Sequence, residues 1–142
     1  MKILILNGPN LSLVGEREPL IYGGVGLKAA CDAWAEEFSP AIIQSIFSNH
    51  EGELIDALHK CGFDHDGIIL NPGGYTHTSV ALRDAVAAIR TPVIEVHISN
   101  PSSRESFRHI SLISPVVRGT ISGLGLMGYR LAIQWLLAQE QG

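Results

Sequence analysis

Residues suited to proton transfer end one of the apolar segments of this chain. Glu95 and His97 lie two residues apart in a segment rich in Ile and Val. Side chains alternate between the two faces of a β-strand, so this spacing places the carboxylate and the imidazole on the same face. A carboxylate in this position orients an imidazole for acid–base chemistry. Together with His77 the pair could instead supply three ligands to a zinc ion, but we favour proton transfer and expect no bound metal.

A cation and a phenol share a glycine-rich stretch near the start of the chain. Arg17 and Tyr22 lie within residues 11–26, which also hold Gly15, Gly23, Gly24 and Gly26. A guanidinium beside a phenol stabilises the phenolate, because a nearby opposite charge lowers the pKa of an acid. Tyr22 could therefore act as a base, although composition alone also suits a ring that anchors the loop. A glycine-rich stretch of this length forms no stable helix or strand, so we predict a mobile lid at about residues 11–26.

Asparagines follow the first and third apolar segments. Asn7, Asn10 and Asn71 lie where the chain is expected to leave the sheet. Asparagine at such a point often completes a turn by bonding its own backbone. The same amides could instead donate hydrogen bonds to a ligand oxygen, as in an oxyanion hole. Both interpretations stay open from these residues alone.

One glycine motif resembles a dinucleotide-binding sequence. Gly123, Gly125 and Gly128 have the GxGxxG spacing, after a predicted strand and before a predicted helix. That function also needs an acidic residue about 20 positions further on, and the sequence ends before such a position. We therefore expect these glycines to allow tight packing of a helix against a strand, and we expect no cofactor.

The elements that must position these residues are short and apolar. Five runs without polar alternation predict the strands of a parallel sheet covered on both faces: Lys2–Leu6, Ile42–Phe47, Gly67–Leu70, Pro92–His97 and Val117–Ser122. Amphipathic patterns predict helices at Leu27–Phe38, Gly52–Cys61, Ser79–Ile89 and Gly128–Gln141, and a short fifth helix at Ser103–Arg108 with Ser102 or Ser103 as its N-cap. The prediction is a single domain over residues 1–142 with a flavodoxin-like, doubly wound, five-stranded parallel sheet. Ligands of such sheets bind beyond the carboxyl ends of the strands, where the candidate residues lie.

Composition limits the possible partners. The 142 residues are 46% hydrophobic and 17% charged, which predicts one well-packed domain. A net charge of -4 gives no basic surface for nucleic acid. No run is long enough to be a membrane span or a signal peptide, so we expect a cytoplasmic protein. Cys31 and Cys61 are expected to be buried free thiols.

Blocks of sequence along the whole chain resemble the type II 3-dehydroquinase family. They are Asn7-Gly8-Pro9-Asn10-Leu11, Gly15-x-Arg17-Glu18-Pro19-x-x-Tyr22-Gly23, Ser48-Asn49-His50-Glu51-Gly52, Asn71-Pro72-Gly73, Thr76-His77-Thr78-Ser79, Glu95-Val96-His97-Ile98-Ser99-Asn100, Arg104-Glu105-x-Phe107-Arg108 and Gly123-x-Gly125-x-x-Gly128-Tyr129. The resemblance implies a flavodoxin-like fold, a dodecamer built from trimers and no cofactor. It implies an anti elimination of water from 3-dehydroquinate, giving 3-dehydroshikimate through an enol or enolate, in the shikimate pathway or in quinate breakdown.

The resemblance also implies a role for each matching residue. Tyr22 is the base that removes a proton alpha to the ketone, and Arg17 lowers its pKa. Asn10 stabilises the enolate oxygen through a water molecule. His97 protonates the departing hydroxyl, and Glu95 orients its ring.

Substrate binding is implied for a second set of residues. These hold the carboxylate and the ring hydroxyls: Asn71, His77, Arg108 and the backbone amides of Ile98 and Ser99. Asp84 is expected to reach the site of a neighbouring subunit. Small departures from the family pattern at Ser12, Val14 and Gly74 touch none of these positions.

Two other functions fit the same predicted fold. The chain could be a flavin-binding or signalling module, because a fold does not fix a function. It could also be a catalytically silent relative that only binds a ligand. A yellow colour of the purified protein would indicate flavin, and the complete set of proposed catalytic residues argues against a silent relative.

Overall fold

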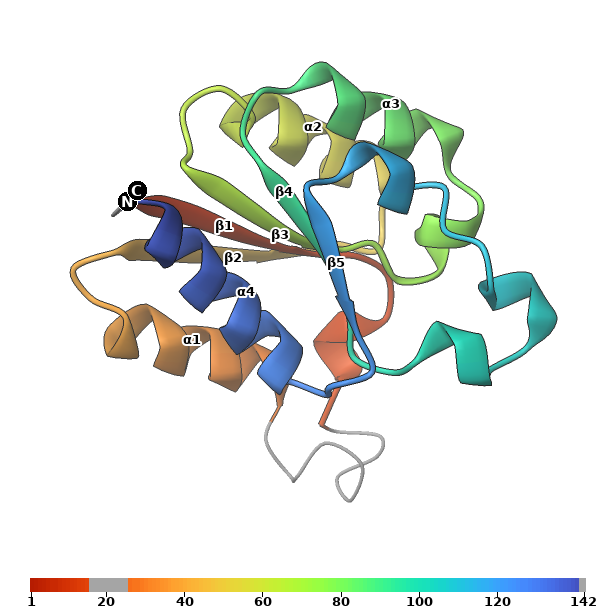
Figure 1. Ribbon diagram of the computed structural model, residues 1–142, viewed down its shortest axis with the longest axis horizontal. Helices are drawn as coiled ribbons and strands as arrows, with labels where there is room; N and C mark the ends of the chain where they lie inside the picture. Colours follow the sequence, from red (N-terminus) through yellow and green to blue (C-terminus); the bar gives the residue numbers. More distant parts are fainter. Residues whose placement is uncertain (16–25, 141–142) are drawn as a thin grey trace.

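A single parallel β-sheet forms the centre of the molecule (Figure 1). The computed structural model describes residues 1–15 and 26–140. The strands are β1 (Lys2–Asn7), β2 (Ile42–Phe47), β3 (Gly67–Asn71), β4 (Val93–His97) and β5 (Gly119–Ser122). Their order across the sheet is β2-β1-β3-β4-β5, with every neighbouring pair parallel. This is the flavodoxin-like order, in which the strand sequence reverses direction at β1 and β3. The predicted fold class is confirmed.

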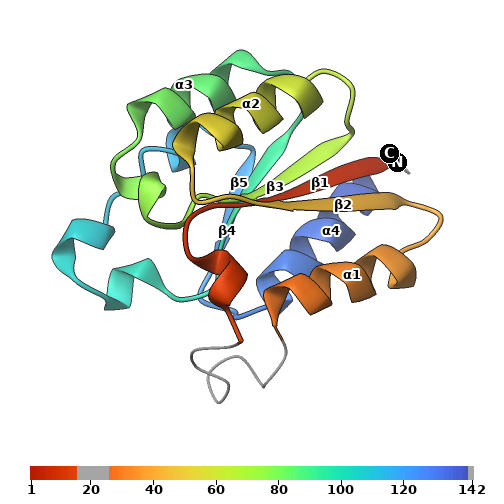
Figure 2. The ribbon, with the colours of Figure 1, turned by 180° about the vertical axis from the view of Figure 1, so that it is seen from behind.

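Two helices cover each face of the sheet (Figure 2). α1 (Leu27–Glu37) and α4 (Met127–Gln139) lie on one face, and α2 (Glu51–Cys61) and α3 (Val80–Ala88) lie on the other. All four predicted helices are present, with ends that coincide with the predicted ones or differ from them by at most two residues. α3 begins after Ser79, whose hydroxyl accepts a hydrogen bond from the backbone N–H of Leu82 at 2.9 Å and so caps the helix.

The continuous apolar runs are explained by a core on each side of the sheet. Ile3 and Ile5 of β1 pack towards α1 and α4, whereas Leu4 and Leu6 pack towards α2 and α3. All four side chains are fully buried. A strand with helices on both faces has no solvent-facing side, so its sequence shows no polar alternation.

The connection from β4 to β5 differs from the prediction. Instead of one helix at Ser103–Arg108, it contains the separate 3-10 turns Pro101–Ser103 and Ser106–Arg108, followed by a third at Ser114–Val116. The predicted serine N-cap was wrong, because the Asn100 side chain accepts the hydrogen bond from Ser102 N–H at 3.2 Å. Arg104 has an extended backbone between the first two turns, which prevents one continuous helix. The connection spans residues 98–118 and projects beyond the end of the sheet before it returns to β5 (Figure 1).

Close backbone contacts hold the ends of β1 and β3 together. A Cβ on Gly8 would lie 2.5 Å from the carbonyl oxygen of Pro72, so only glycine fits there. Gly73 has a φ of +61°, which also favours glycine. The loops that carry the candidate asparagines are therefore fixed against one another.

Several smaller predictions are also tested. Cys31 and Cys61 are buried free thiols, as expected, and burial raises the pKa of Cys31 to about 12. A Cβ on Gly128 would lie 3.3 Å from the Ile121 side chain, so α4 packs tightly on the sheet as predicted for this glycine. None of the helices in the described part of the chain has the length and apolar character needed to cross a membrane.

Candidate active site

A cavity opens at the carboxyl ends of the strands, near the reversal point of the sheet. Its volume is about 410 Å³. Six of the predicted site residues line it: Asn10, Asn71, His77, Ile98, Ser99 and Arg108. These residues come from three chain segments, at the ends of β1, β3 and β4, so the sheet brings together positions that are up to about a hundred residues apart in sequence.

His97 lines a second cavity that adjoins the first. This cavity also has a volume of about 410 Å³, and it shares His77, Pro101 and Arg108 with the first one. Seven of the predicted site residues are therefore grouped at one end of the sheet, in two cavities with a common wall. His77 and Arg108 lie in that wall.

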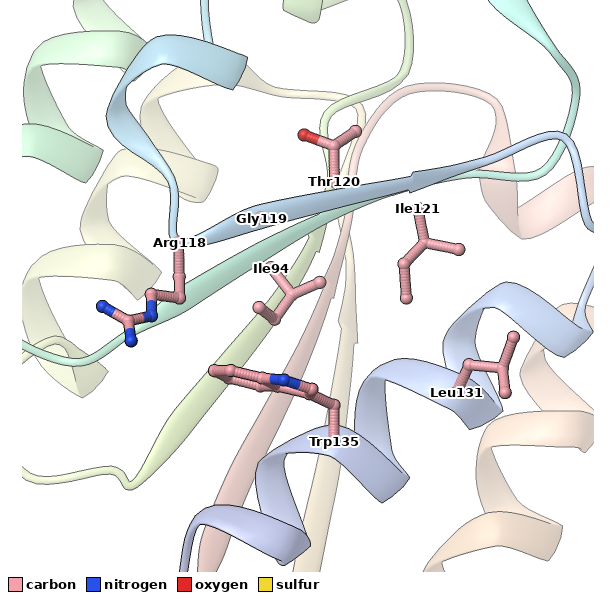
Figure 3. A pocket seen from close by; sticks show the side chains of 7 residues that line it. All are labelled: Ile94, Arg118, Gly119, Thr120, Ile121, Leu131 and Trp135. Atoms are coloured by element: carbon pink, nitrogen blue, oxygen red, sulfur yellow. The ribbon is translucent and has the colours of Figure 1, made fainter.

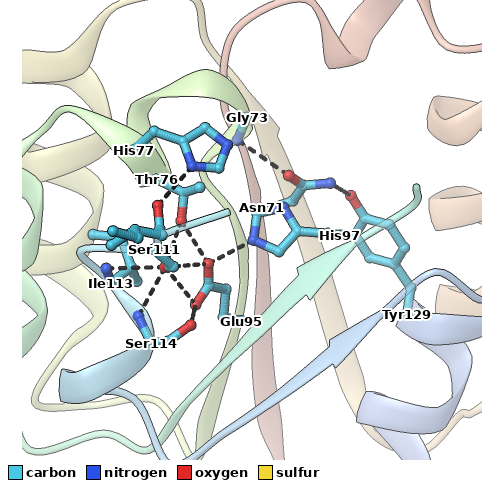
Figure 4. Close-up of polar contacts among 11 residues, drawn as sticks. Asn71, Gly73, Thr76, His77, Glu95, His97, Ser111, Ile113, Ser114 and Tyr129 are labelled. Carbon is cyan, nitrogen blue, oxygen red and sulfur yellow. Dashed lines mark hydrogen bonds and ion pairs between the residues drawn. The ribbon is translucent and has the colours of Figure 1, made fainter. Parts of the chain in front are cut away.

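Glu95 and His97 form the closest acid–base pair of the site (Figure 4). The imidazole Nε2 lies 2.5 Å from Glu95 Oε2, which confirms that the two side chains share a face of β4. A carboxylate can only accept hydrogen bonds, so Nε2 carries the hydrogen of this contact. Nδ1 is then the ring nitrogen that can exchange a proton with a ligand. The pair has the geometry of an imidazole oriented for general acid catalysis.

Glu95 is fully buried and is surrounded by hydroxyl groups (Figure 4). Its carboxylate accepts hydrogen bonds from Thr76 at 2.5 Å, Ser111 at 3.0 Å and Ser114 at 2.7 Å. Burial raises the pKa of Glu95, but the hydrogen bonds from His97, Thr76 and Ser114 outweigh it and hold the pKa below its ordinary value. A buried charge is costly unless it is paired and hydrogen-bonded, and this one is both. Glu95 is therefore held ionised behind the imidazole.

The sequence did not reveal that these three hydroxyl groups contact Glu95. Ser111 and Ser114 lie in the long connection before β5, far from Glu95 in sequence. Their contact with the carboxylate depends on how that connection returns over the sheet. The only sequence signal is the pair of serines three residues apart, which by itself indicates little more than a turn.

His77 is oriented by the same connection. Its Nδ1 lies 2.8 Å from the carbonyl oxygen of Ile110. A carbonyl only accepts, so Nδ1 carries the hydrogen and Nε2 is left for a ligand. Since His77 lines both cavities, this nitrogen is available to a hydroxyl or a carboxylate of a bound molecule.

Asn10 has a strained backbone beside the first cavity. Its φ of 70° is the only positive value among the non-glycine residues that the structure describes. Its backbone N–H donates to the side-chain oxygen of Asn49 at 3.0 Å, which helps to hold this conformation. Asparagine tolerates the left-handed region better than most residues. Strain of this kind is frequent where a side chain is held for function.

Two arginines supply positive charge to the first cavity. Arg108 contacts Glu105 through Nε at 2.6 Å and lies over the Phe107 ring, 5.0 Å from its centroid. Arg104 lines the same cavity and contacts the Ser99 hydroxyl at 3.4 Å. Arg104 was not among the predicted site residues, although its spacing of four from Arg108 was visible in the sequence. Two guanidinium groups can attract a small carboxylate in a chain whose net charge is negative.

Three predicted residues are not among those that the structure places at these cavities. Arg17 and Tyr22, and with them most of the predicted lid, lie outside the described residues. Asp84 is exposed on α3 and lines neither cavity. His77 does not join Glu95 and His97 in a metal site, because residues 1–15 and 26–140 contain no group of three His, Cys, Asp or Glu side chains able to hold an ion.

A third cavity, of about 370 Å³, lies between β5 and α4 (Figure 3). Leu131 and Trp135 face it from the helix, and Arg118 lies where β5 begins. Its lining is mostly aliphatic and aromatic, and no acid–base pair is found among the described residues that form it. The chemically equipped site is therefore the one at the carboxyl ends of the strands.

Comparison with known proteins gives a consistent result over nearly the whole chain. The family model described as "Dehydroquinase class II" matches residues 1–137. A 3-dehydroquinate dehydratase from Bacillus licheniformis is 55% identical in an alignment of 139 positions that covers 95% of this chain and 94% of the relative. One from Roseiflexus castenholzii is 53% identical and covers 96% of this chain and 88% of its own. The crystal structure of a type II dehydroquinase from Butyrivibrio crossotus superposes with a TM-score of 0.87 at 46% identity, covering 96% of this chain and 97% of that one.

Proposed function

This chain belongs to the class II dehydroquinase family, and on that premise we propose how it works as a 3-dehydroquinate dehydratase. Such a hydro-lyase removes water from 3-dehydroquinate to give 3-dehydroshikimate. The elimination is anti and passes through an enol or enolate. It requires a base for a proton alpha to the ketone, a group that stabilises the enolate oxygen, and an acid for the departing hydroxyl.

The proposed base is Tyr22, activated by Arg17. A free tyrosine with a pKa of about 10 is ionised in only about one molecule per thousand at neutral pH, so an unassisted phenol is a poor base. Lowering the pKa by about three units takes about 4 kcal/mol, which a close cation can supply only where water is largely excluded. The proposed role of the lid at residues 11–26 is to close over the substrate and exclude that water.

The proposed acid is His97, with Glu95 behind it. After the alpha proton has left, the enolate expels the hydroxyl, and the imidazole donates a proton to it so that it leaves as water. The ionised Glu95 stabilises the imidazolium before this step and keeps Nε2 protonated after it. The support for this assignment is the 2.5 Å contact of the pair and the hydroxyl groups that keep the carboxylate charged.

The substrate is proposed to lie in the cavity lined by Asn10, Asn71 and Arg108. Asn10 acts through a water molecule on the enolate oxygen. Further contacts to the carboxylate and ring hydroxyls are assigned to His77 and to the backbone amides of Ile98 and Ser99. Arg104 adds a second cation for the carboxylate in this proposal.

The assembly is proposed to be a dodecamer built from trimers. The enzyme is proposed to work in the cytoplasm, in the shikimate pathway or in quinate breakdown. Asp84 would then contribute to the site of a neighbouring subunit. Its exposure on α3 is consistent with a contact between subunits.

The Glu95–His97 pair, beside the cavity that Arg104 and Arg108 line, carries the proposal. Its test is the ultraviolet absorbance of the enone formed when purified protein is mixed with 3-dehydroquinate without added cofactor or metal. We expect absorbance to rise at a rate proportional to enzyme, and to rise at least about a hundredfold more slowly with the His97→Ala variant. A folded wild-type protein that produces no enone would contradict the proposed function.

A further inference from the structure

A buried phenol joins the ends of the two central strands. Tyr129 of α4 is fully buried, and its ring stacks on Trp34 with centroids 5.8 Å apart. Its hydroxyl lies between the side-chain amides of Asn7 and Asn71, at 2.8 Å from each. These asparagines are the last residues of β1 and β3 and are paired in the sheet. Asn71 also lines the proposed substrate cavity, whereas Tyr129 does not.

The direction of every hydrogen bond in this group follows from one backbone amide. Gly73 N–H can only donate, so the atom of Asn71 that faces it at 3.1 Å must be the oxygen Oδ1. Asn71 Nδ2 then faces the phenol, which accepts from it (Figure 4). The phenol has a single hydrogen, and it goes to the oxygen of Asn7. The result is a directed chain from Asn71 through Tyr129 to Asn7.

The network gives hydrogen-bond partners to both polar atoms of the Asn71 side chain but only to the oxygen of the Asn7 side chain. Asn7 Nδ2 is buried and has no hydrogen-bond partner among the described residues. An unpaired buried N–H destabilises a fold, so a network that served stability alone would be expected to pair it. Burial also raises the pKa of Tyr129, so the phenol stays neutral and can accept and donate at the same time.

We propose that Tyr129 is a positioning residue for the dehydration, which sets the orientation of the Asn71 amide towards the substrate. The terminal torsion of an asparagine is soft, so the amide needs contacts on both ends to keep one orientation. Gly73 holds the oxygen and Tyr129 holds the nitrogen. The second Nδ2 hydrogen and the second lone pair of Oδ1 are then presented to a substrate oxygen with a fixed polarity. This inference rests on the proposed function, in which Asn71 binds substrate.

A double-mutant cycle on kcat/KM tests the coupling. Tyr129→Phe keeps the ring and its stacking on Trp34 but removes the hydroxyl, and we expect kcat/KM to fall about 5- to 20-fold. Asn71→Ala should lower it about 10- to 100-fold. Because Tyr129 acts through Asn71, the double variant should lie within about twofold of Asn71→Ala alone. Ile133→Val, one turn further along α4 and also fully buried, is the matched control, with a lower unfolding midpoint and unchanged kcat/KM.

The outcomes separate this inference from the function on which it rests. Reductions that multiply in the double variant would overturn it, as would an unchanged kcat/KM in Tyr129→Phe. An active wild type with an unaffected Asn71→Ala variant would also overturn it while leaving the dehydratase activity intact, whereas an inactive, folded wild type would contradict the function itself. If Tyr129→Phe does not fold, Asn7→Ala replaces it in the cycle, because loss of the acceptor releases the phenol hydrogen towards Asn71. The same non-additive result is then expected.

Discussion

Replacing Glu95 with glutamine removes one charge from the centre of the proposed acid and changes little else. The amide oxygen can keep the Oε2 position, where it still accepts from His97 Nε2 and from the Thr76 hydroxyl. The amide nitrogen then takes the Oε1 position opposite Ser114, whose hydroxyl can rotate and accept instead of donating. The contacts are therefore retained, and the fold should be retained with them.

The expected loss of turnover follows from the hydrogen bond to His97. A hydrogen bond to a charged group contributes about 1.5–3 kcal/mol, and one between neutral groups about 0.5–1.5 kcal/mol. Glu95 has no exposed surface, so solvent does not screen its charge. If the imidazolium loses about 1–2 kcal/mol of stabilisation, turnover should fall about 5- to 30-fold. His97→Ala should lose more, because no proton donor remains for the departing hydroxyl.

Turnover is measured from enone absorbance at saturating substrate, and stability from denaturant unfolding across a range of pH. The pKa of Glu95 in the folded protein is lowered from its ordinary value of 4.5, so the charged carboxylate stabilises the folded wild type at pH values above 4.5. This contribution to stability is lost as the pH falls through the folded pKa. Glu95→Gln should lack that acid-dependent loss. Unchanged turnover in Glu95→Gln would refute the role of the carboxylate, and a collapse of stability at neutral pH would assign the residue to folding instead.

Three further predictions concern the base, metal dependence and assembly. Tyr22→Phe should lower turnover by about 100- to 10,000-fold, because the ring stays but the proton acceptor is lost, and a nearly normal rate in the same assay would return Tyr22 to the role of a loop anchor. Activity should survive exhaustive dialysis against EDTA, because the proposed elimination uses side chains alone; loss of rate that zinc or magnesium restores would disprove this. Light scattering should give a mass many times the 15.3 kDa of one chain, and a fully active monomer would contradict the proposed contribution of Asp84 to a neighbouring site.

The sequence alone determined the fold class and placed the boundaries of the five strands and the four long helices to within two residues. Strands of a parallel sheet are buried on both faces, so an unbroken apolar run such as the one in Lys2–Leu6 is enough to predict one. The two-residue spacing of Glu95 and His97 predicted their shared face because strand periodicity is local. The resemblance to a known family supplied the proposed roles of Arg17, Tyr22 and Asp84, because roles that depend on a substrate or on a neighbouring subunit leave no local pattern in a sequence.

The tertiary structure decided everything that depends on long loops and on distant partners. The backbone of Arg104 divides the predicted short helix into two turns, and no local pattern reveals this. Ser111 and Ser114 reach Glu95 only because the connection before β5 returns over the sheet. In the sequence Tyr129 occupies one more apolar position of a predicted helix. Its hydroxyl nevertheless hydrogen-bonds to Asn7 and Asn71, at strand ends more than fifty residues away. Hydrogen-bond partners across such separations are set by the packing of whole elements, which short-range propensity and periodicity do not encode.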